Sequence, residues 1–203
     1  YKPIGISVLV TPWNYPAAMG TRKIAPAIAA GCPVIIKPAS ETPLTMLELM
    51  PLLEEAGVPK GLLSVLPSRN TSKLVDHLLH DPRVRLVSFT GSTEVGRKLL
   101  KVAADQVLKT SMELGGNAPL IIFDDADINT AIEGALLAKM RNLGEACTAA
   151  NRIYVHEDIA QEFKSKFSER MGSLKVGNGL DKSVDVCPLV NAETRDKVKY
   201  FVD

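Results

Sequence analysis

The feature that most constrains the fold of this chain is a regular alternation of short apolar runs with longer segments of helical periodicity. Each apolar run has the length of a strand and is followed by a helical pattern. The expected strand and helix pairs are 6–10 with 17–30, 34–37 with 43–56, 62–66 with 72–80, and 86–89 with 93–103. Nearly continuous apolar strands joined by helices are typical of a parallel sheet covered on both faces. We therefore predict an open α/β fold, in which ligands bind at the carboxyl ends of the strands.

A turn signal near the middle of the chain divides it into two parts. The segment Leu114-Gly115-Gly116-Asn117 follows a strand that ends at Glu113, and a new strand is expected at 119–123 before an Asp-rich helix start. We therefore place a boundary between two domains, 1–115 and 116–203. In the second domain we expect a strand at 152–156 and helices at 131–139, 159–171 and 192–202.

Charge and hydropathy exclude several classes of function. The chain holds 24 Lys and Arg residues against 23 Asp and Glu, so it lacks the basic surface that nucleic acid or an anionic membrane requires. Its longest apolar runs are interrupted by Pro, Gly or charge, which argues against a membrane span or a secretory signal. We expect a soluble, cytoplasmic protein whose partner is a small molecule or another subunit. Because the chain begins at Tyr1 and stops within a helical pattern, we interpret it as a piece of a larger protein.

The three cysteines form neither an even set nor a CxxC pair, which argues against a disulfide framework and against a zinc knuckle. Cys147 lies in a polar, glycine-containing stretch between an expected helix and an expected strand, where a thiolate could meet a ligand. An arbitrary cysteine is more often a buried structural residue. That structural interpretation stands for Cys32 and Cys187, which both lie next to a proline.

Two polar residues fall where strands are expected to end. Glu113 lies between Met112 and Leu114, and partial desolvation there would raise its pKa and make it a usable general base. The alternative is a solvated surface carboxylate. Asn14 lies in a turn that two prolines, Pro12 and Pro16, hold in place. Its side-chain amide could donate a hydrogen bond to a developing oxyanion. The alternative is that Asn14 caps the helix that Pro16 begins.

Two further segments have the features of a phosphate site. Lys37-Pro38-Ala39-Ser40 follows the second expected strand, so a cation and a hydroxyl project from one edge of the sheet. Phe89-Thr90-Gly91-Ser92 opens a helix, whose free amides and positive end could face a pyrophosphate. The GxGxxG fingerprint is absent, so the motif alone does not indicate an ordinary dinucleotide fold.

In this order and spacing, five segments together resemble the aldehyde dehydrogenase superfamily across the entire chain. They are Pro12-Trp13-Asn14, Lys37-Pro38-Ala39-Ser40, Phe89-Thr90-Gly91-Ser92 with Gly96, Glu113-Leu114-Gly115-Gly116, and Gly144-Glu145-Ala146-Cys147 continuing to Ala150-Asn151-Arg152. The resemblance covers the middle part of a family chain. It implies that 1–115 is most of a Rossmann-like nicotinamide-dinucleotide domain with an open parallel sheet, and that 116–203 is the start of an α/β catalytic domain.

The resemblance also implies a role for each matched residue. Cys147 would be the nucleophile, and the Asn14 amide and the Cys147 backbone N–H would hold the oxyanion of its thiohemiacetal. Hydride transfer to the nicotinamide would leave a thioester, which a water activated by Glu113 would hydrolyse to a carboxylate. The implied cofactor-binding residues are Thr11, Pro12, Trp13, Asn14, Lys37, Pro38, Ala39, Ser40, Gly91, Ser92, Gly96 and Leu114.

A closer resemblance concerns the substrate. Arg22 and Arg141 match two arginines that succinate-semialdehyde dehydrogenases use to hold the substrate carboxylate, a task that suits a guanidinium fork. Two surface or salt-bridged arginines are the alternative. Other substrates to consider are glutarate semialdehyde and, if the arginines face elsewhere, an uncharged aliphatic aldehyde. An inactive binding or structural relative is a further possibility.

The cofactor preference rests on Ser40. NAD-dependent family members often carry Glu at this position, whereas Ser40 together with Lys37 suits a 2′-phosphate, so we predict that NADP is preferred and NAD possible. If Glu41 faces the ribose instead, NAD regains the advantage. No metal is expected, and the resemblance implies a homo-oligomeric parent, either a dimer or a tetramer. Glu145 departs from the Gln that the family most often carries, and a carboxylate there opposes thiolate formation at Cys147.

Overall fold

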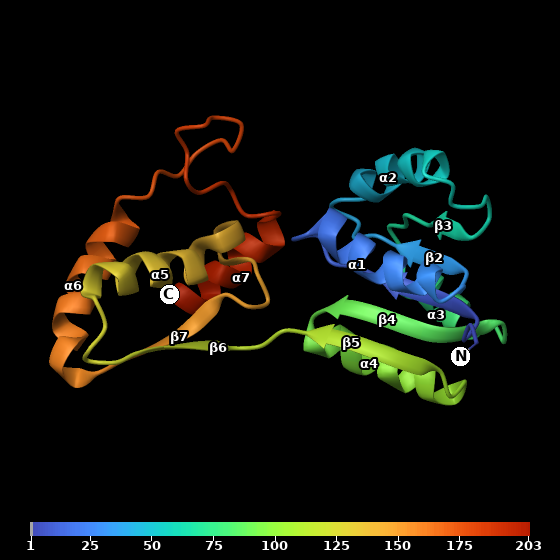
Figure 1. Cartoon of the computed structure of the whole chain (residues 1–203), viewed down its shortest axis with the longest axis horizontal. Coiled ribbons are helices and arrows are strands. Elements are labelled where there is room, and N and C mark those ends of the chain that lie inside the picture. Colours follow the sequence, from blue (N-terminus) through green and yellow to red (C-terminus); the bar gives the residue numbers. More distant parts are fainter. Residues whose placement is uncertain (1) are drawn as a thin grey trace. The chain divides into compact units, whose positions relative to one another are not determined.

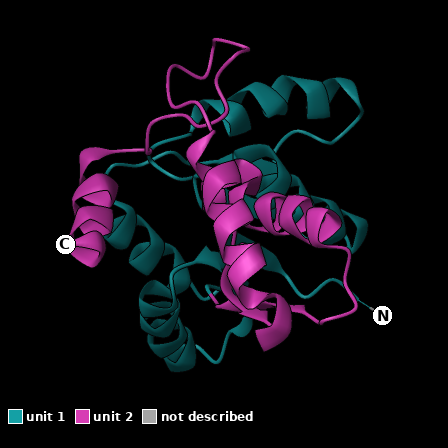
Figure 2. Ribbon diagram, turned by 90° about the vertical axis from the view of Figure 1, so that its left-hand side faces the viewer, with its two compact units in different colours: residues 1–115 teal, residues 116–203 magenta. Residues whose placement is uncertain are grey.

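The computed structural model describes residues 2–203, which form two compact units. The first unit ends at Gly115 and the second comprises Gly116–Asp203 (Figures 1 and 2). The change from one unit to the next falls on the glycine pair at which the sequence places its boundary.

The first unit is an open, five-stranded parallel sheet, as the alternation of strands and helices predicts. The strand order is β3-β2-β1-β4-β5. The strands are β1 (Ile6–Val10), β2 (Val34–Lys37), β3 (Leu63–Val65), β4 (Val84–Gly91) and β5 (Lys109–Leu114). The helices are α1 (Pro16–Ala29), α2 (Leu44–Glu55), α3 (Thr71–Leu79) and α4 (Thr93–Asp105).

Two apolar clusters form the core of this unit, one on each face of the sheet. Successive side chains of a strand point to opposite faces, so Val8 and Val10 pack with α3 and α4, whereas Leu9 packs with α1 and α2. Val87 at 0% exposed and Ile36 at 0% exposed lie at the centres of the two clusters. Burial on both faces explains why the strand sequences are almost continuously apolar.

The strand order reverses beside β1, and this reversal sets the place where ligands bind in such sheets. The chain runs outward from β1 to β2 and β3 and then returns to add β4 on the other side of β1. The connections that leave β1 and β4 therefore diverge to opposite faces and leave a crevice at the carboxyl ends of these two strands. Thr11 follows β1, and Thr90 lies near the end of β4.

The second unit contains a two-stranded parallel sheet, β6 (Ala118–Ile122) and β7 (Ala150–Val155). Its helices are α5 (Ile128–Met140), the short 3₁₀ helix η1 (Arg141–Gly144), α6 (Glu157–Gly172) and α7 (Ala192–Val202). Ile122, Ile132 and Phe163 form its core, so α5 and α6 cover one face of the strands. Helix α5 begins three residues before the expected start, because Asp127 caps it by accepting a 2.8 Å hydrogen bond from the Thr130 backbone N–H.

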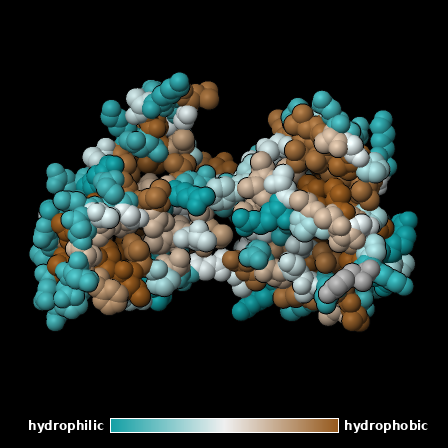
Figure 3. All heavy atoms as spheres, viewed as in Figure 1, coloured by the Kyte–Doolittle hydropathy of each residue, from teal (hydrophilic) through white to brown (hydrophobic). Residues whose placement is uncertain are grey.

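Apolar side chains also reach the surface of both units, interspersed with hydrophilic ones (Figure 3). Ile121 and Tyr154 are register partners on β6 and β7 and are 60% and 53% exposed, so the second face of this small sheet is open. No helix in residues 2–203 combines the length and the apolar character needed to cross a membrane.

Candidate functional site

Two buried threonines at the carboxyl edge of the first sheet leave polar atoms without partners. The side chains of Thr11, 4% exposed, and Thr90, 9% exposed, have hydroxyl oxygens that make no hydrogen bond with the described residues. An unsatisfied buried polar group costs about 1–3 kcal/mol. These hydroxyls beside the strand reversal therefore suit a polar ligand that would complete their hydrogen bonds.

Lys37 and Ser40 lie together where β2 ends. The Lys37 Nζ donates to the Ser40 Oγ at 3.5 Å, and that hydroxyl donates to the Ser68 carbonyl oxygen at 3.0 Å. Burial lowers the pKa of the Lys37 ammonium, and the nearby Glu41 carboxylate partly opposes this shift. The arrangement holds a cation and a hydroxyl side by side at the neighbouring strand end, with a carboxylate close enough to act on the cation.

An apolar pocket of about 470 Å³ lies between α3 and α4. Its walls include Val75 and Leu79 from α3 and Val95, Leu99 and Val102 from α4. The sequence analysis assigned no function to these residues. Their spacing of three or four along each helix marks an apolar stripe, but the same spacing is typical of an ordinary core-facing helix.

The beginning of α4 is a capped helix end. The Ser92 Oγ accepts a 3.3 Å hydrogen bond from the Val95 backbone N–H and so caps the helix. The predicted cofactor contact of this hydroxyl would therefore have to be made in addition to the cap. Gly96 lies one turn further along, and a Cβ added there would meet the Leu114 side chain at 2.6 Å. Gly96 therefore allows α4 to pack closely on β5, which brings the start of α4 to the carboxyl edge of the sheet.

Asn14 does not cap α1, so that alternative interpretation is wrong. The N-cap residue is Tyr15, and no side chain makes the capping hydrogen bond. Pro12, Trp13 and Asn14 are half-buried in the turn after β1. Asn14 therefore lies in the turn that follows Thr11 at the carboxyl end of β1.

Lys23 is a buried cation that the sequence analysis did not identify. It is 9% exposed, and its Nζ donates a 2.8 Å hydrogen bond to the Ser88 Oγ on β4. Burial lowers the pKa of Lys23, and the opposing influence of the Glu113 carboxylate shows that the two charges are close. A lysine within a helical pattern is usually solvated. The burial of Lys23 becomes evident only from the packing of α1 on the sheet, where Lys23 meets Ser88 of β4.

Glu113 lies on the edge strand β5, where its register partner on β4 is Thr90. A partly desolvated carboxylate is expected from the sequence, but Glu113 is exposed. Among residues 2–203, β5 has a neighbouring strand on one side only, so the apolar residues adjacent in sequence do not enclose the Glu113 side chain. Arg22, next to Lys23 on α1, is also exposed.

One of the two arginines lines a pocket in the second unit together with the residues that flank the nucleophile candidate. Cys147 is exposed, whereas Cys32 is buried and Cys187 is half-buried, as expected for one accessible thiol. A pocket of about 430 Å³ is lined by Arg141 and by the residues on either side of the cysteine, Ala146 and Thr148. The structure thus brings a guanidinium into the surroundings of the thiol.

The residues between Arg141 and Cys147 have an unusual backbone. Asn142, Leu143 and Gly144 have φ angles of 51°, 61° and 78°, all in the left-handed region. Burial raises the pKa of Glu145, which lies two residues before Cys147, because desolvation acts against the charged form of its carboxyl group.

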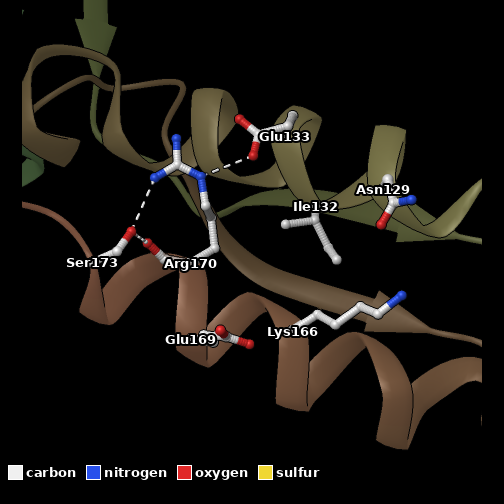
Figure 4. A pocket seen from close by; sticks show the side chains of 7 residues that line it. All are labelled: Asn129, Ile132, Glu133, Lys166, Glu169, Arg170 and Ser173. Atoms are coloured by element: carbon white, nitrogen blue, oxygen red, sulfur yellow. Dashed lines mark hydrogen bonds and ion pairs between the residues drawn. The ribbon is translucent and has the colours of Figure 1, made fainter.

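Two other polar clusters in the second unit do not contain the predicted site residues. A pocket of about 320 Å³ between α5 and α6 has four charged side chains among its lining residues, and two of these, Arg170 and Glu133, form an ion pair at 2.9 Å (Figure 4). Asp124, His156 and Asp158 offer potential metal-ligating atoms within 4.8 Å of one another. The His156 Nδ1, however, accepts a hydrogen bond from the Asp158 backbone N–H and caps α6.

Comparison with known proteins gives one consistent result. The chain matches the aldehyde dehydrogenase family over residues 1–203. It is 54% identical over 202 residues to a succinate-semialdehyde dehydrogenase from Paenarthrobacter nicotinovorans, covering 100% of this chain and 45% of the relative. It is 47% identical to a glutarate-semialdehyde dehydrogenase from Pseudomonas aeruginosa, covering 99% of this chain and 41% of the relative. The chain thus spans less than half the length of these relatives.

Solved structures agree with the sequence matches. An NADP-dependent enzyme from E. coli superposes with a TM-score of 0.95 at 46% identity, covering 99% of this chain and 42% of that protein. A betaine aldehyde dehydrogenase from Staphylococcus aureus in complex with NAD⁺ has a TM-score of 0.95 at 39% identity, covering 99% of this chain and 40% of that protein. The match along the whole chain, the relatives and the shared Rossmann-like fold lead to one conclusion: this chain belongs to the aldehyde dehydrogenase family.

Proposed function

We propose that the full-length protein oxidises succinate semialdehyde to succinate with NADP as the hydride acceptor. The observation that carries this proposal is the pocket that Arg141 shares with both neighbours of Cys147. A guanidinium in a pocket lined by the neighbours of the attacking residue suits an aldehyde whose far end is a carboxylate, because the fork can bind both carboxylate oxygens. Arg22 is the second guanidinium that we assign to this carboxylate. The names of the relatives support the same choice, since both describe enzymes for carboxylated aldehydes.

The proposed chemistry begins at the Cys147 Sγ, which attacks the aldehyde carbon and forms a thiohemiacetal. The carbonyl oxygen becomes an oxyanion, and the Asn14 side-chain amide and the Cys147 backbone N–H donate hydrogen bonds to it. The nicotinamide, when bound, accepts the hydride that leaves the thiohemiacetal carbon. Glu113 then takes a proton from the water that attacks the resulting thioester. Succinate leaves, and Cys147 returns to the thiolate form that attacked the aldehyde.

The residues of the first unit fit a dinucleotide by their chemistry. Within residues 2–203 the hydroxyls of Thr11 and Thr90 have no hydrogen-bond partner, so both could bind polar groups of the dinucleotide at the strand reversal. The start of α4 offers backbone amides for the pyrophosphate, and the apolar pocket between α3 and α4 suits an adenine ring. We assign the 2′-phosphate of NADP to Lys37 and Ser40, whose side chains are 3.5 Å apart. The Glu41 carboxylate acts against this preference through its closeness to Lys37.

Glutarate semialdehyde is a second candidate substrate. It carries the same two reactive ends, and a relative that is 47% identical is named for it. The arginines would hold its carboxylate in the same way, so only the distance from Arg141 to the reacting carbon separates the two substrates. The homo-oligomeric state and the cytoplasmic location stay predictions.

Steady-state assays of the full-length protein test the proposal. Succinate semialdehyde, glutarate semialdehyde and butanal should each be compared with NADP and with NAD. We expect the highest kcat/KM for succinate semialdehyde with NADP, and no requirement for an added thiol acceptor. A higher kcat/KM for butanal would refute the carboxylate site, and turnover that depends on coenzyme A would refute the hydrolytic role of Glu113.

A further inference from the structure

The loop that carries Cys147 has a backbone that its own sequence does not favour. Three consecutive residues, Asn142, Leu143 and Gly144, adopt left-handed φ angles of 51°, 61° and 78°. Glycine and asparagine tolerate this region, but a leucine there is a steric outlier. Such a conformation persists only where surrounding contacts hold it in place. The contacts at the two ends of this loop therefore determine whether it keeps this conformation.

Lys139 and Asn151 join the two ends of the loop. Lys139 lies near the end of α5, two residues before Arg141, and Asn151 lies at the start of β7, two residues after Ala149. The Lys139 Nζ donates a 2.9 Å hydrogen bond to the Asn151 Oδ1. This bond spans twelve positions of the chain and closes the base of the segment 141–149.

The same pair connects the loop to two other parts of the unit. The Asn151 Nδ2 donates a 3.4 Å hydrogen bond to the carbonyl oxygen of Gly116, three residues after Glu113. A Cβ added at Gly144 would lie 3.2 Å from the Lys139 carbonyl oxygen, so the loop folds back onto the end of α5. Asn151 thus uses its amide both as acceptor and as donor, which an aspartate or a leucine could not do.

We propose that Lys139 and Asn151 are positioning residues, which hold the segment 141–149 in the strained conformation that places Arg141 and Cys147 for one substrate. This inference rests on the proposed function. Neither side chain is required to touch the substrate. Their effect is to fix the separation between the guanidinium and the thiol, and a looser loop would reduce productive binding of a carboxylated aldehyde.

Lys139→Met in the full-length protein tests the pair, with Lys139→Arg as the conservative variant and the exposed Lys164→Met on α6 as the matched control. We expect Lys139→Met to lower kcat/KM for succinate semialdehyde by about five- to tenfold, less than the loss of a charged hydrogen bond to the substrate itself, because Lys139 acts only through the loop. Lys139→Arg should recover most of this loss. The Kd for NADP should not change, and Lys164→Met should match the unmodified protein in every measurement.

Hydrogen exchange of the backbone amides in 141–149 reports how firmly this segment is held, and it does so without depending on activity. Lys139→Met and Asn151→Ala should each speed exchange in this segment, and the double variant should exchange no faster than Asn151→Ala alone, because both substitutions remove the hydrogen bond between Lys139 and Asn151. Unchanged exchange in Lys139→Met, or strictly additive losses in the double variant, would overturn the proposal. If the unmodified protein did not oxidise aldehydes, the proposed function would fail, and exchange would still decide whether the pair holds the loop.

Discussion

The two units place their functional residues in different ways. In the first unit, the candidate residues follow regular parallel strands, and Thr11, Lys37 and Thr90 are buried at the carboxyl edge of the sheet. In the second unit, Arg141 and Cys147 belong to an irregular, exposed loop that contains three left-handed residues. The first arrangement follows from topology, whereas the second depends on a few local contacts. We therefore expect substitutions of Lys37 and Ser40 at the strand ends to change cofactor choice, and those of Arg141 and Cys147 in the loop to change substrate choice and chemistry.

The largest effect should come from Cys147→Ala, because the loop 141–149 holds no second thiol. Dehydrogenase activity of the full-length protein should fall to background, while the Kd for NADP stays unchanged. Cys187→Ala, which alters a half-buried cysteine elsewhere in the same unit, is the control and should keep full activity. A Cys147→Ala protein with measurable turnover would show that the loop is not the site of covalent chemistry.

Arg141→Ala and Arg22→Ala should each weaken substrate selection. A charged hydrogen-bonded contact contributes about 1.5–3 kcal/mol, so kcat/KM for succinate semialdehyde should fall by about 10- to 100-fold. The loss for butanal should be much smaller, since butanal has no carboxylate to bind. Equal losses for both aldehydes would indicate that the arginines stabilise the fold rather than bind the substrate.

Ser40→Glu should change the cofactor preference without changing the aldehyde preference. A carboxylate at this strand end would repel a 2′-phosphate and accept hydrogen bonds from ribose hydroxyls. The ratio of kcat/KM with NADP to that with NAD should therefore fall by about tenfold or more, as close like charges cost several kcal/mol. If the unmodified protein already prefers NAD, the assignment of Ser40 and Lys37 to the 2′-phosphate is wrong.

The smallest effect is expected for Lys23→Met and concerns how the free energy of unfolding depends on pH. Burial lowers the pKa of Lys23 in the folded chain below its usual value of 10.5. Between the folded pKa and 10.5, the unfolded chain binds more protons, so the free energy of unfolding rises with pH through that window. Lys23→Met should remove this part of the rise in urea unfolding experiments, while Lys101→Met, an exposed lysine of the same unit, should not. Parallel pH profiles for the two variants would contradict the burial argument.

Much of the first unit could be predicted from the sequence, because apolar runs and helical periodicity determine a parallel sheet almost directly. Strand β2 occupies the predicted residues, and the accessibility of Cys147 follows from its polar, glycine-containing surroundings. The burial of Lys23 could not be predicted, since it depends on a contact with Ser88, which is 65 positions away. The exposure of Glu113 was also missed, because sequence does not reveal that β5 is an edge strand.

The loop of the second unit was the least predictable part. A left-handed Leu143 contradicts its intrinsic preference and arises from contacts at both ends of the segment. The pair of Lys139 and Asn151 gives no signal in sequence, since each residue alone resembles a solvated surface residue. Functional sites are where such departures from local preference are expected.

Trapping the intermediate tests the central claim most directly, namely that Cys147 becomes acylated by a carboxylated aldehyde and that Glu113 acts afterwards. The Glu113→Gln variant of the full-length protein should be mixed with succinate semialdehyde and NADP, quenched and examined by peptide mass spectrometry. We predict a burst of NADPH followed by slow turnover, with a succinyl thioester on the peptide that contains Cys147. A thioester on Cys32 or Cys187, or a burst without any acylated cysteine, would contradict the account.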